Sequence, residues 1–195
     1  MKTKFFLLLT VFVSLSLSSC IDGKKKNSDS NINENDFVKV SIHNDYSIRI
    51  PRHMQKTTGL NSDASFQYQN IHREIDTIVI DEPKEEFADA LKELGHEEKS
   101  TLPFYRDIQL KRLAERMDIT HQSNPFQMNI SGLAAEAIEI DAKVDNIDEE
   151  LTYFLTFLEG ESKIYMIMSW TLKSKKEKSK KTFMKIAKSF ELIEE

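Results

Sequence analysis

The chain has 195 residues, of which 39% are hydrophobic and 30% charged, and its formal net charge is −5 at pH 7. Five glycines, four prolines and one cysteine exclude a collagen, a disulfide scaffold and a low-complexity chain. A single thiol forms no intramolecular disulfide and supports no zinc site built on several cysteines. The length fits one ordinary domain with a tail. The acidic balance argues against nucleic acid as a partner.

The N-terminus has the three regions of a secretory signal peptide. Lys2 and Lys4 precede a short apolar stretch at residues 5–13, and serines follow up to Cys20. The apolar stretch is well short of the roughly 20 residues that a membrane-spanning helix needs. Residues 17–20, Leu-Ser-Ser-Cys, resemble the lipobox of bacterial lipoprotein precursors.

The lipobox resemblance implies that residues 1–19 are a signal peptide and that Cys20 begins the mature chain. A diacylglyceryl group is then expected on the Cys20 thiol and an acyl group on its new α-amino group. Two or more acyl chains hold a protein at a membrane effectively permanently. The alternative is an ordinary signal peptide or N-terminal anchor in which the cysteine occurs by chance.

A polar segment follows the cysteine. Residues 21–36 contain only two apolar side chains, which bury too little to offset the entropy cost of ordering them. We therefore predict a flexible tether over residues 20–36. Lys24, Lys25 and Lys26 either contact anionic headgroups or only keep the tether soluble. Surface-exported lipoproteins of similar style carry an acidic run here, so the lysines favour the periplasmic face of the outer membrane of a Gram-negative bacterium.

Strand-like alternation begins at Phe37, and residues 37–195 are expected to form one domain. Apolar residues alternate with polar ones over residues 38–42 and again over 46–50, with a turn at Asn44 and Asp45 and a stop at Pro51. Two paired strands are the natural interpretation. Two further strands are predicted near residues 66–69 and 74–81, after a polar loop at residues 57–63.

Two helices are predicted next. Pro83 suits the first turn of one helix, and Gly95 suits its left-handed end. Another helix is expected to begin near Ser100 or Thr101, with Pro103 in its first turn. Core-facing stripes with helical spacing are Phe87, Leu91 and Leu94 in the first helix and Leu110, Leu113, Ala114 and Met117 in the second.

Residues 118–172 are interpreted as antiparallel strands. Apolar residues share one parity over residues 138–144 while acidic residues, including Glu139 and Asp141, take the other, which predicts one buried and one solvent-exposed face. Residues 151–158 form a nearly continuous apolar strand. Residues 164–172 are apolar on both parities, as in a central strand covered on both faces.

A closing helix is predicted over residues 174–192. Ser174 and Glu177 fit a capping box, and the stripe facing the sheet is Phe183, Ile186, Ala187 and Phe190. Lysines crowd its first turns, where the helix dipole disfavours cations. They form either a basic patch for an acidic partner or a solvated face whose stems cover apolar surface. The lysines concerned are Lys175, Lys176, Lys178, Lys180 and Lys181.

The order β-β-β-β-α-α-β-β-β-α indicates an α+β fold with an antiparallel β-sheet flanked by helices. This order resembles the PsbP-like superfamily, which includes the photosystem II extrinsic protein, the yeast Ran-binding Mog protein and many bacterial lipoproteins. Residues 46–51, Tyr-Ser-Ile-Arg-Ile-Pro, resemble its opening strand, and the strand at 164–172 with the helix after it resembles its ending. The resemblance implies a fold but supplies no family-wide catalytic residues.

Motifs for chemistry are missing from the sequence. The five histidines stand apart, with no His-x-His or His-Glu-x-x-His, and they are His43, His53, His72, His96 and His121. A metal site could assemble from strand-end residues such as His43 and His72, but isolated turn histidines are the better interpretation. Sequence signatures of a catalytic nucleophile, a phosphate loop or a calcium loop do not occur. We predict no catalytic, cofactor or metal residues, and we interpret the methionines Met117, Met128, Met166 and Met168 as core packing.

Two functional hypotheses remain. The first is a membrane-anchored, non-catalytic binding or accessory module of the cell envelope, which contacts an envelope protein through Lys175, Lys178 and Lys181 or through the loop at residues 57–63. The second is an envelope enzyme, or a small-ligand or metal binder, with a site assembled from dispersed residues. The second predicts a deep pocket with converging His, Asp or Glu groups of shifted pKa.

Overall fold

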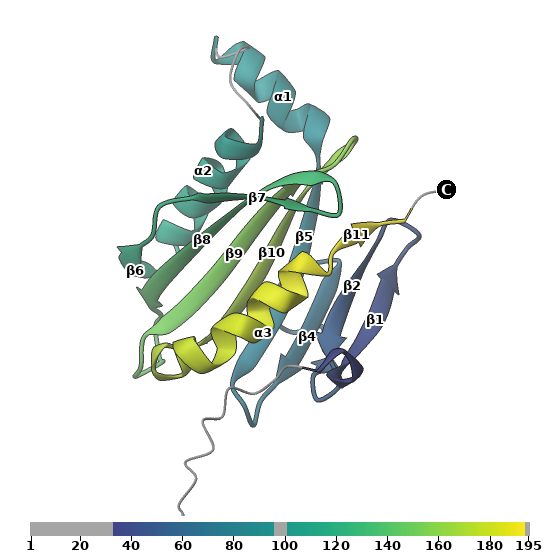
Figure 1. Cartoon of the computed structure of the whole chain (residues 1–195). Coiled ribbons are helices and arrows are strands. Elements are labelled where there is room, and N and C mark those ends of the chain that lie inside the picture. Colours follow the sequence, from purple (N-terminus) through teal and green to yellow (C-terminus); the bar gives the residue numbers. More distant parts are fainter. Residues whose placement is uncertain (1–32, 96–100, 194–195) are drawn as a thin grey trace, which may run out of the picture. The chain divides into compact units, whose positions relative to one another are not determined.

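The computed structural model describes residues 33–95 and 101–193. The predicted signal peptide, Cys20, most of the tether, His96 and Ser100 lie outside the described residues. The described residues form one compact unit. It is an α+β fold with two antiparallel sheets and three α-helices (Figure 1), which confirms the predicted class.

The main sheet has eight strands in the order β3-β4-β5-β10-β9-β8-β6, with β7 also pairing with β8. Strand β10 pairs with β5 on one side and β9 on the other, so the predicted central strand is confirmed. The strands are β3 (Gln55–Lys56), β4 (Phe66–Asn70), β5 (Ile75–Pro83), β6 (Asp118–Gln122), β7 (Phe126–Ile130), β8 (Leu133–Lys143), β9 (Leu151–Glu159) and β10 (Lys163–Leu172).

A second, small sheet has the order β1-β2-β11. It consists of β1 (Phe37–Ile42), β2 (Tyr46–Pro51) and β11 (Glu191–Leu192). The first two strands form the predicted hairpin, in which Ile42 faces Tyr46. Tyr46, Ile48 and Ile50 are fully buried, because this sheet packs against the same core as α3.

Three helices cover the main sheet: α1 (Lys84–Glu93), α2 (Thr101–Ala114) and α3 (Lys176–Lys188). Helices α1 and α2 lie on one face and α3 lies on the other (Figure 1). Gly95, with φ +69°, takes the left-handed end of the first helix as predicted. Leu94 is an exception to the predicted stripe, since it is 60% exposed. None of the helices in the described residues is long and apolar enough to cross a membrane.

The closing helix is shorter than predicted at both ends. Ser174 lies in a 3-10 turn, η2 (Lys173–Lys175), and its amide donates to Glu149 Oε1 at 2.7 Å. The capping box is therefore wrong: Lys175 is the N-cap, and no side chain caps the helix. At the other end, α3 stops at Lys188 because the chain turns to pair β11 with β2.

The structure has two strands between α2 and β8 that the sequence did not predict, since only three strands were predicted over residues 118–172. Strands β6 and β7 both pair with β8, whose first residue is Leu133 rather than Ile138. Ser131 and Gly132, with φ 50° and 87°, form the tight turn between β7 and β8. Most residues of β6 and β7 are exposed, so their hydrophobic pattern is weak. The two-residue strand β3 was also not predicted.

The end of the predicted tether belongs to the folded unit. Residues Glu34–Asp36 form a 3-10 turn, η1. The carbonyl of Asp36 accepts from the amide of Arg52 at 2.8 Å. Glu34 Oε1 lies 2.9 Å from Lys185 Nζ of α3. These contacts offset the entropy cost of ordering residues 34–36, which the few apolar side chains of the segment do not offset.

Candidate functional site

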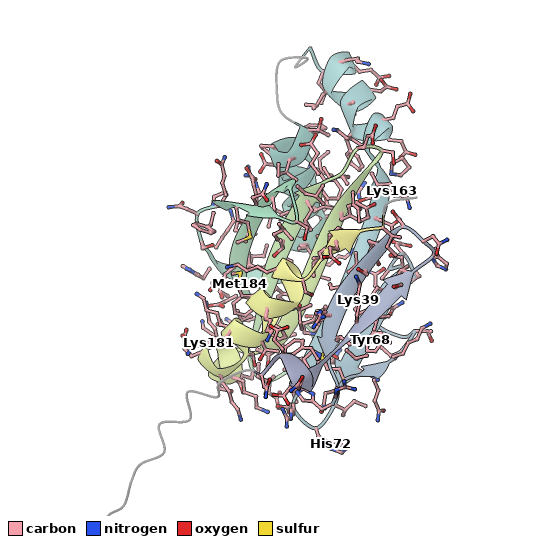
Figure 2. All side chains as sticks on the ribbon, turned by 45° about the vertical axis from the view of Figure 1, so that its right-hand side comes forward. Lys39, Tyr68, His72, Lys163, Lys181 and Met184 are labelled. Atoms are coloured by element: carbon pink, nitrogen blue, oxygen red, sulfur yellow. The ribbon has the colours of Figure 1, made fainter. Side chains whose placement is uncertain are left out.

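A cleft of about 230 Å³ lies between α3 and the edge of the main sheet formed by β7 and β8. Its apolar side chains come from both sides of this gap: Phe126, Ala137, Phe154, Ile167, Phe183, Met184 and Ala187. Phe126 begins β7 and is 63% exposed at the rim. Met184 and Lys181 lie together along α3 (Figure 2). An exposed aromatic residue beside an apolar cleft is typical of a binding surface.

Charged residues at the rim of the cleft are paired with each other. Lys180 Nζ of α3 lies 2.5 Å from Glu139 Oε1 of β8, and Lys176 Nζ lies 3.3 Å from its other oxygen. The hydrogen bond to Glu139 raises the pKa of Lys180 above its ordinary value. The predicted solvent-exposed face of residues 138–144 is therefore wrong, because α3 lies over it and places lysines on its acidic residues.

Asp141 lies next to this pair and is only 4% exposed. Thr152 donates a hydrogen bond to Asp141 Oδ1 at 2.6 Å, Lys173 Nζ lies 3.3 Å from Oδ2, and Lys176 Nζ lies 3.5 Å from Oδ1. Burial opposes ionisation of the carboxyl, but the hydrogen bonds from Thr152 and Lys173 outweigh it and lower its pKa. Asp141 thus holds the start of α3 on the sheet.

Polar groups inside the cleft also have partners in the fold. The hydroxyl of Ser169 lies 2.9 Å from that of Thr77, and the Ser123 hydroxyl accepts from the Glu139 amide at 3.0 Å. A bound group would therefore gain mainly from burial of apolar surface, at about 25 cal/mol per Å². The arrangement suits recognition of an apolar group and offers no converging acid and base.

A second cavity of about 410 Å³ lies on the other face of the main sheet, between α2 and the loop before β4. Met166 and Met168 line it together with Asn61 and Asp63 of the polar loop. Gln109 Nε2 donates to Glu82 Oε2 at 2.6 Å in this cavity. The loop proposed from sequence as a contact surface therefore lies at the mouth of a cavity.

Solved structures of other proteins share this architecture. The solution structure of cyanobacterial PsbP (CyanoP) from Synechocystis sp. PCC 6803 superposes with a TM-score of 0.54 at 15% identity, covering 85% of this chain and 97% of that one. LpqN, involved in cell envelope biogenesis of Mycobacterium tuberculosis, superposes with a TM-score of 0.52 at 9% identity, over 81% and 91%. The chain has the PsbP-like fold.

The predicted resemblance to the PsbP-like fold is thus confirmed at the level of structure. The Saccharomyces cerevisiae Ran-binding protein Mog1p superposes with a TM-score of 0.49 at 10% identity, over 81% of this chain and 96% of that one. The sequence itself matches no protein-family model and no curated protein. At these identities the PsbP-like fold carries no function with it.

On this PsbP-like fold the three lysines expected to bind a partner have different surroundings. Lys175 is paired with Glu74 of the turn before β5. Lys178 and Lys181 are exposed on α3, and Lys181 lines a shallow hollow with Met184 and Lys188. A partner surface at Lys175, Lys178 and Lys181 stays a prediction.

The described histidines belong to no cluster of possible metal ligands within the described part of the PsbP-like fold. Among residues 33–95 and 101–193, no three His, Cys, Asp or Glu side chains are grouped so that they could hold a metal ion. His53 Nδ1 lies 3.3 Å from Asn70 Nδ2, and burial together with the charge of Arg73 lowers the pKa of His53. Met166 and Met168 are buried, as core packing predicts.

The sequence interpretation missed Phe126 and Met184, which flank the cleft. Phe126 lies on β7, an edge strand with little alternation. The dipeptide Ser131-Gly132 is the signal that could have revealed this hairpin, since serine followed by glycine is typical of turns. Met184 lies outside the helical stripe, so periodicity does not mark it.

Proposed function

We propose that this protein is a lipid-anchored, non-catalytic binding module of the cell envelope, which holds an apolar group of an envelope partner in the α3 cleft. The observation that carries the proposal is the cleft itself, with apolar walls, an exposed Phe126 at its rim and charged groups already paired. Such a site gains binding energy from burial and specificity from its rim.

The proposed cellular location of the protein rests on the sequence. Residues 17–20 resemble a lipobox, and Cys20 is the sole cysteine of the chain. The fold shared with LpqN, a protein involved in cell envelope biogenesis, supports the same compartment. We place the module at the periplasmic face of the outer membrane of a Gram-negative bacterium, anchored through lipid on Cys20.

The enzyme hypothesis predicts a cavity in which titratable groups of shifted pKa converge. Asp76 has a pKa raised to about 6 by burial, but it lines neither of the two cavities described above. In the α3 cleft, Glu139 is neutralised by Lys176 and Lys180.

Asp81 lines the second cavity together with Asp63 and Glu82, and the pKa of Asp81 is lowered. Lys163 Nζ holds Asp81 at 2.7 Å, however, and Gln109 Nε2 holds Glu82 at 2.6 Å. Because these carboxylates already have partners in the fold, the contacts favour the binding module.

Lipid attachment is tested by growing cells with radiolabelled palmitate. We expect label in the wild-type protein and none in Cys20→Ser. An inhibitor of lipoprotein signal peptidase should cause the uncleaved precursor to accumulate. Wild-type protein without label would overturn the anchor.

Binding in the cleft is tested by photo-crosslinking in intact cells. A photoreactive residue replaces Phe126 at the rim or, as a control, the exposed Lys111 of α2. We expect one envelope protein, identified by mass spectrometry, to be crosslinked from position 126 and not from 111. Ala137→Trp, which fills the cleft, should abolish the product while leaving the thermal unfolding midpoint near the wild-type value. A product that persists in Ala137→Trp would contradict the proposal.

A further inference from the structure

Strand β7 is an open edge of the main sheet. It pairs with β8 on one side, and no strand of the described residues pairs with its other side (Figure 1). An edge strand presents unpaired backbone groups that can accept another strand. Proteins usually protect such edges with charged side chains, with proline or by keeping the strand very short.

The other edge strands carry these protections and β7 does not. Each of the four others that the structure describes has a charged side chain: Lys39 on β1, Lys56 on β3, Asp118 on β6 and Glu191 on β11. Strands β3 and β11 also have only two residues each. Strand β7 has five residues, Phe-Gln-Met-Asn-Ile, with no charge and no proline. Its edge is therefore left open to pairing, in a chain of which 30% of the residues are charged.

The turn between β7 and β8 decides which backbone groups of β7 are free. Ile130 faces Leu133 across the two-residue turn, and the pair that closes such a hairpin exchanges both of its hydrogen bonds. Along an antiparallel strand, every second residue bonds to the same neighbouring strand. The amide and carbonyl groups of Gln127 and Asn129 therefore point away from β8, towards the open edge.

The two faces of β7 differ in character. Gln127 and Asn129 are exposed on one face, whereas Phe126 lines the α3 cleft on the other. Met128 shares the face of Phe126 and packs against the core cluster that contains Phe183 of α3. A strand added beside β7 would point every second side chain to this face, next to Phe126. The cleft of about 230 Å³ would then receive one such side chain.

We propose that an extended segment of the envelope partner adds to the open edge of β7 as a further strand and places one apolar side chain in the α3 cleft. The inference rests on the proposed function, in which the cleft holds an apolar group of that partner. An extended polypeptide satisfies the free backbone groups of Gln127 and Asn129, which an acyl chain or a helix cannot do. In strand addition the backbone bonds supply affinity, and alternate side chains supply specificity.

Backbone pairing is tested by removing one amide of β7 from the full chain that carries a photoreactive residue at position 126. Gln127→Pro deletes an N–H that points away from β8, and proline is tolerated at such edge positions. Gln127→Ala is the matched control, because it removes the side chain and keeps the amide. We expect the crosslinked partner to be lost in Gln127→Pro and kept in Gln127→Ala, with both thermal unfolding midpoints near the wild-type value. Equal crosslinking in the two variants overturns the inference.

The partner segment is tested with synthetic peptides. Mass spectrometry of the crosslinked product identifies the segment, and copies of it carry a single N-methyl group at successive residues. Binding to the full-length protein in detergent is measured by fluorescence polarisation. An added strand turns every second amide towards β7, so we expect at least about tenfold weaker binding at alternate residues and little change between them. Effects without this alternation overturn the inference, and the series decides the question even if Gln127→Pro does not fold.

The two proposals fail in different ways. If position 126 gives no crosslinked envelope protein, the proposed function is wrong. If the product forms and is lost in Ala137→Trp but persists in Gln127→Pro, the cleft holds the partner and strand addition is wrong. A crosslink from position 126 to a second copy of this chain overturns the inference as well, since the open edge then pairs with itself.

Discussion

Lys163 Nζ lies 2.7 Å from a carboxylate oxygen of Asp81, its neighbour on the adjacent strand β5. The same ammonium lies 2.7 Å from Asp45, in the turn between β1 and β2, and Asp45 also accepts from the Tyr165 hydroxyl at 2.7 Å. Lys163 thereby joins the small sheet to the main sheet. Burial opposes ionisation of Asp81, but the bond from Lys163 lowers its pKa below the ordinary 3.8.

Replacing this lysine should destabilise the protein in a pH-dependent way. We expect Lys163→Met to cost about 1–2 kcal/mol at about pH 7, since it leaves two carboxylates without a cation and the site is partly screened by solvent. A carboxyl group whose pKa is lower in the folded state stabilises the fold at any pH above its unfolded-state pKa. This contribution to the free energy of unfolding is lost as the pH falls through the folded-state pKa. The deficit should therefore shrink below about pH 4.

The measurement is urea unfolding followed by the fluorescence of Trp170, the single tryptophan. Lys111→Met on the exposed side of α2 is the control and should change little at either pH. An equal deficit for Lys163→Met in neutral and acidic buffer would show that the Asp81 ion pair is not the cause.

Removing the charge of Asp76 should stabilise the protein at high pH, whereas Lys163→Met should destabilise it there. Burial raises the pKa of Asp76 to about 6, so the folded state prefers the protonated form. The destabilising cost of the charge is fully present above about pH 6 and disappears as the pH falls towards the unfolded value near 4. We expect Asp76→Asn to raise the free energy of unfolding by about 2 kcal/mol at about pH 8 and to have no effect at about pH 3.5. Asp118→Asn, at an exposed carboxyl, should be neutral at both; equal behaviour of the two variants would refute the raised pKa.

Phe190 is expected to be one of the most costly residues to truncate. It is fully buried, with its ring 5.0 Å from Tyr46 and 4.9 Å from Tyr165 between ring centres. Phe190→Ala should cost about 3–5 kcal/mol in a denaturant titration. Phe126→Ala removes the same side chain from an exposed site and should change stability by less than about 0.5 kcal/mol. Similar losses at both positions would mean that burial does not control the effect.

Gly132 should resist substitution because of its backbone. Its φ of +87° lies in the turn that joins β7 to β8, where a side chain is strained although space is available. We expect Gly132→Ala to destabilise by about 1 kcal/mol. Gly59→Ala is the matched control: its φ is ordinary and no atom lies within 4 Å of the added carbon, so it should be neutral or slightly stabilising. A neutral Gly132→Ala in thermal unfolding would argue against this turn.

Much of the fold was predictable because its signals are local. The apolar run at residues 164–172 identified the central strand, since burial on both faces requires apolar residues at both parities. Gly95 marked the end of α1 through its backbone freedom. Strands β6 and β7 escaped prediction because an exposed edge strand needs no apolar alternation.

The end of α3 and the partners of its lysines depended on distant residues. Residues 189–192 continue a helical pattern, yet Glu191 and Leu192 pair with β2, and this pairing ends the helix. The acidic alternation at Glu139 and Asp141 indicates a solvated face when viewed locally. Only the packing of α3 shows that the carboxylates are neutralised, because hydropathy does not reveal which element covers a strand.

The sequence by itself determined the fold class and the central strand, since these depend on composition and periodicity, and one short motif predicts a lipid anchor at Cys20. Tertiary structure alone decided which lysines are neutralised, where the apolar cleft lies and which surface borders the entry of the chain. The physical reason is the distance along the chain over which each kind of interaction acts. Backbone preference and burial act on neighbouring residues, whereas ion pairs and clefts join residues whose proximity is created by the fold.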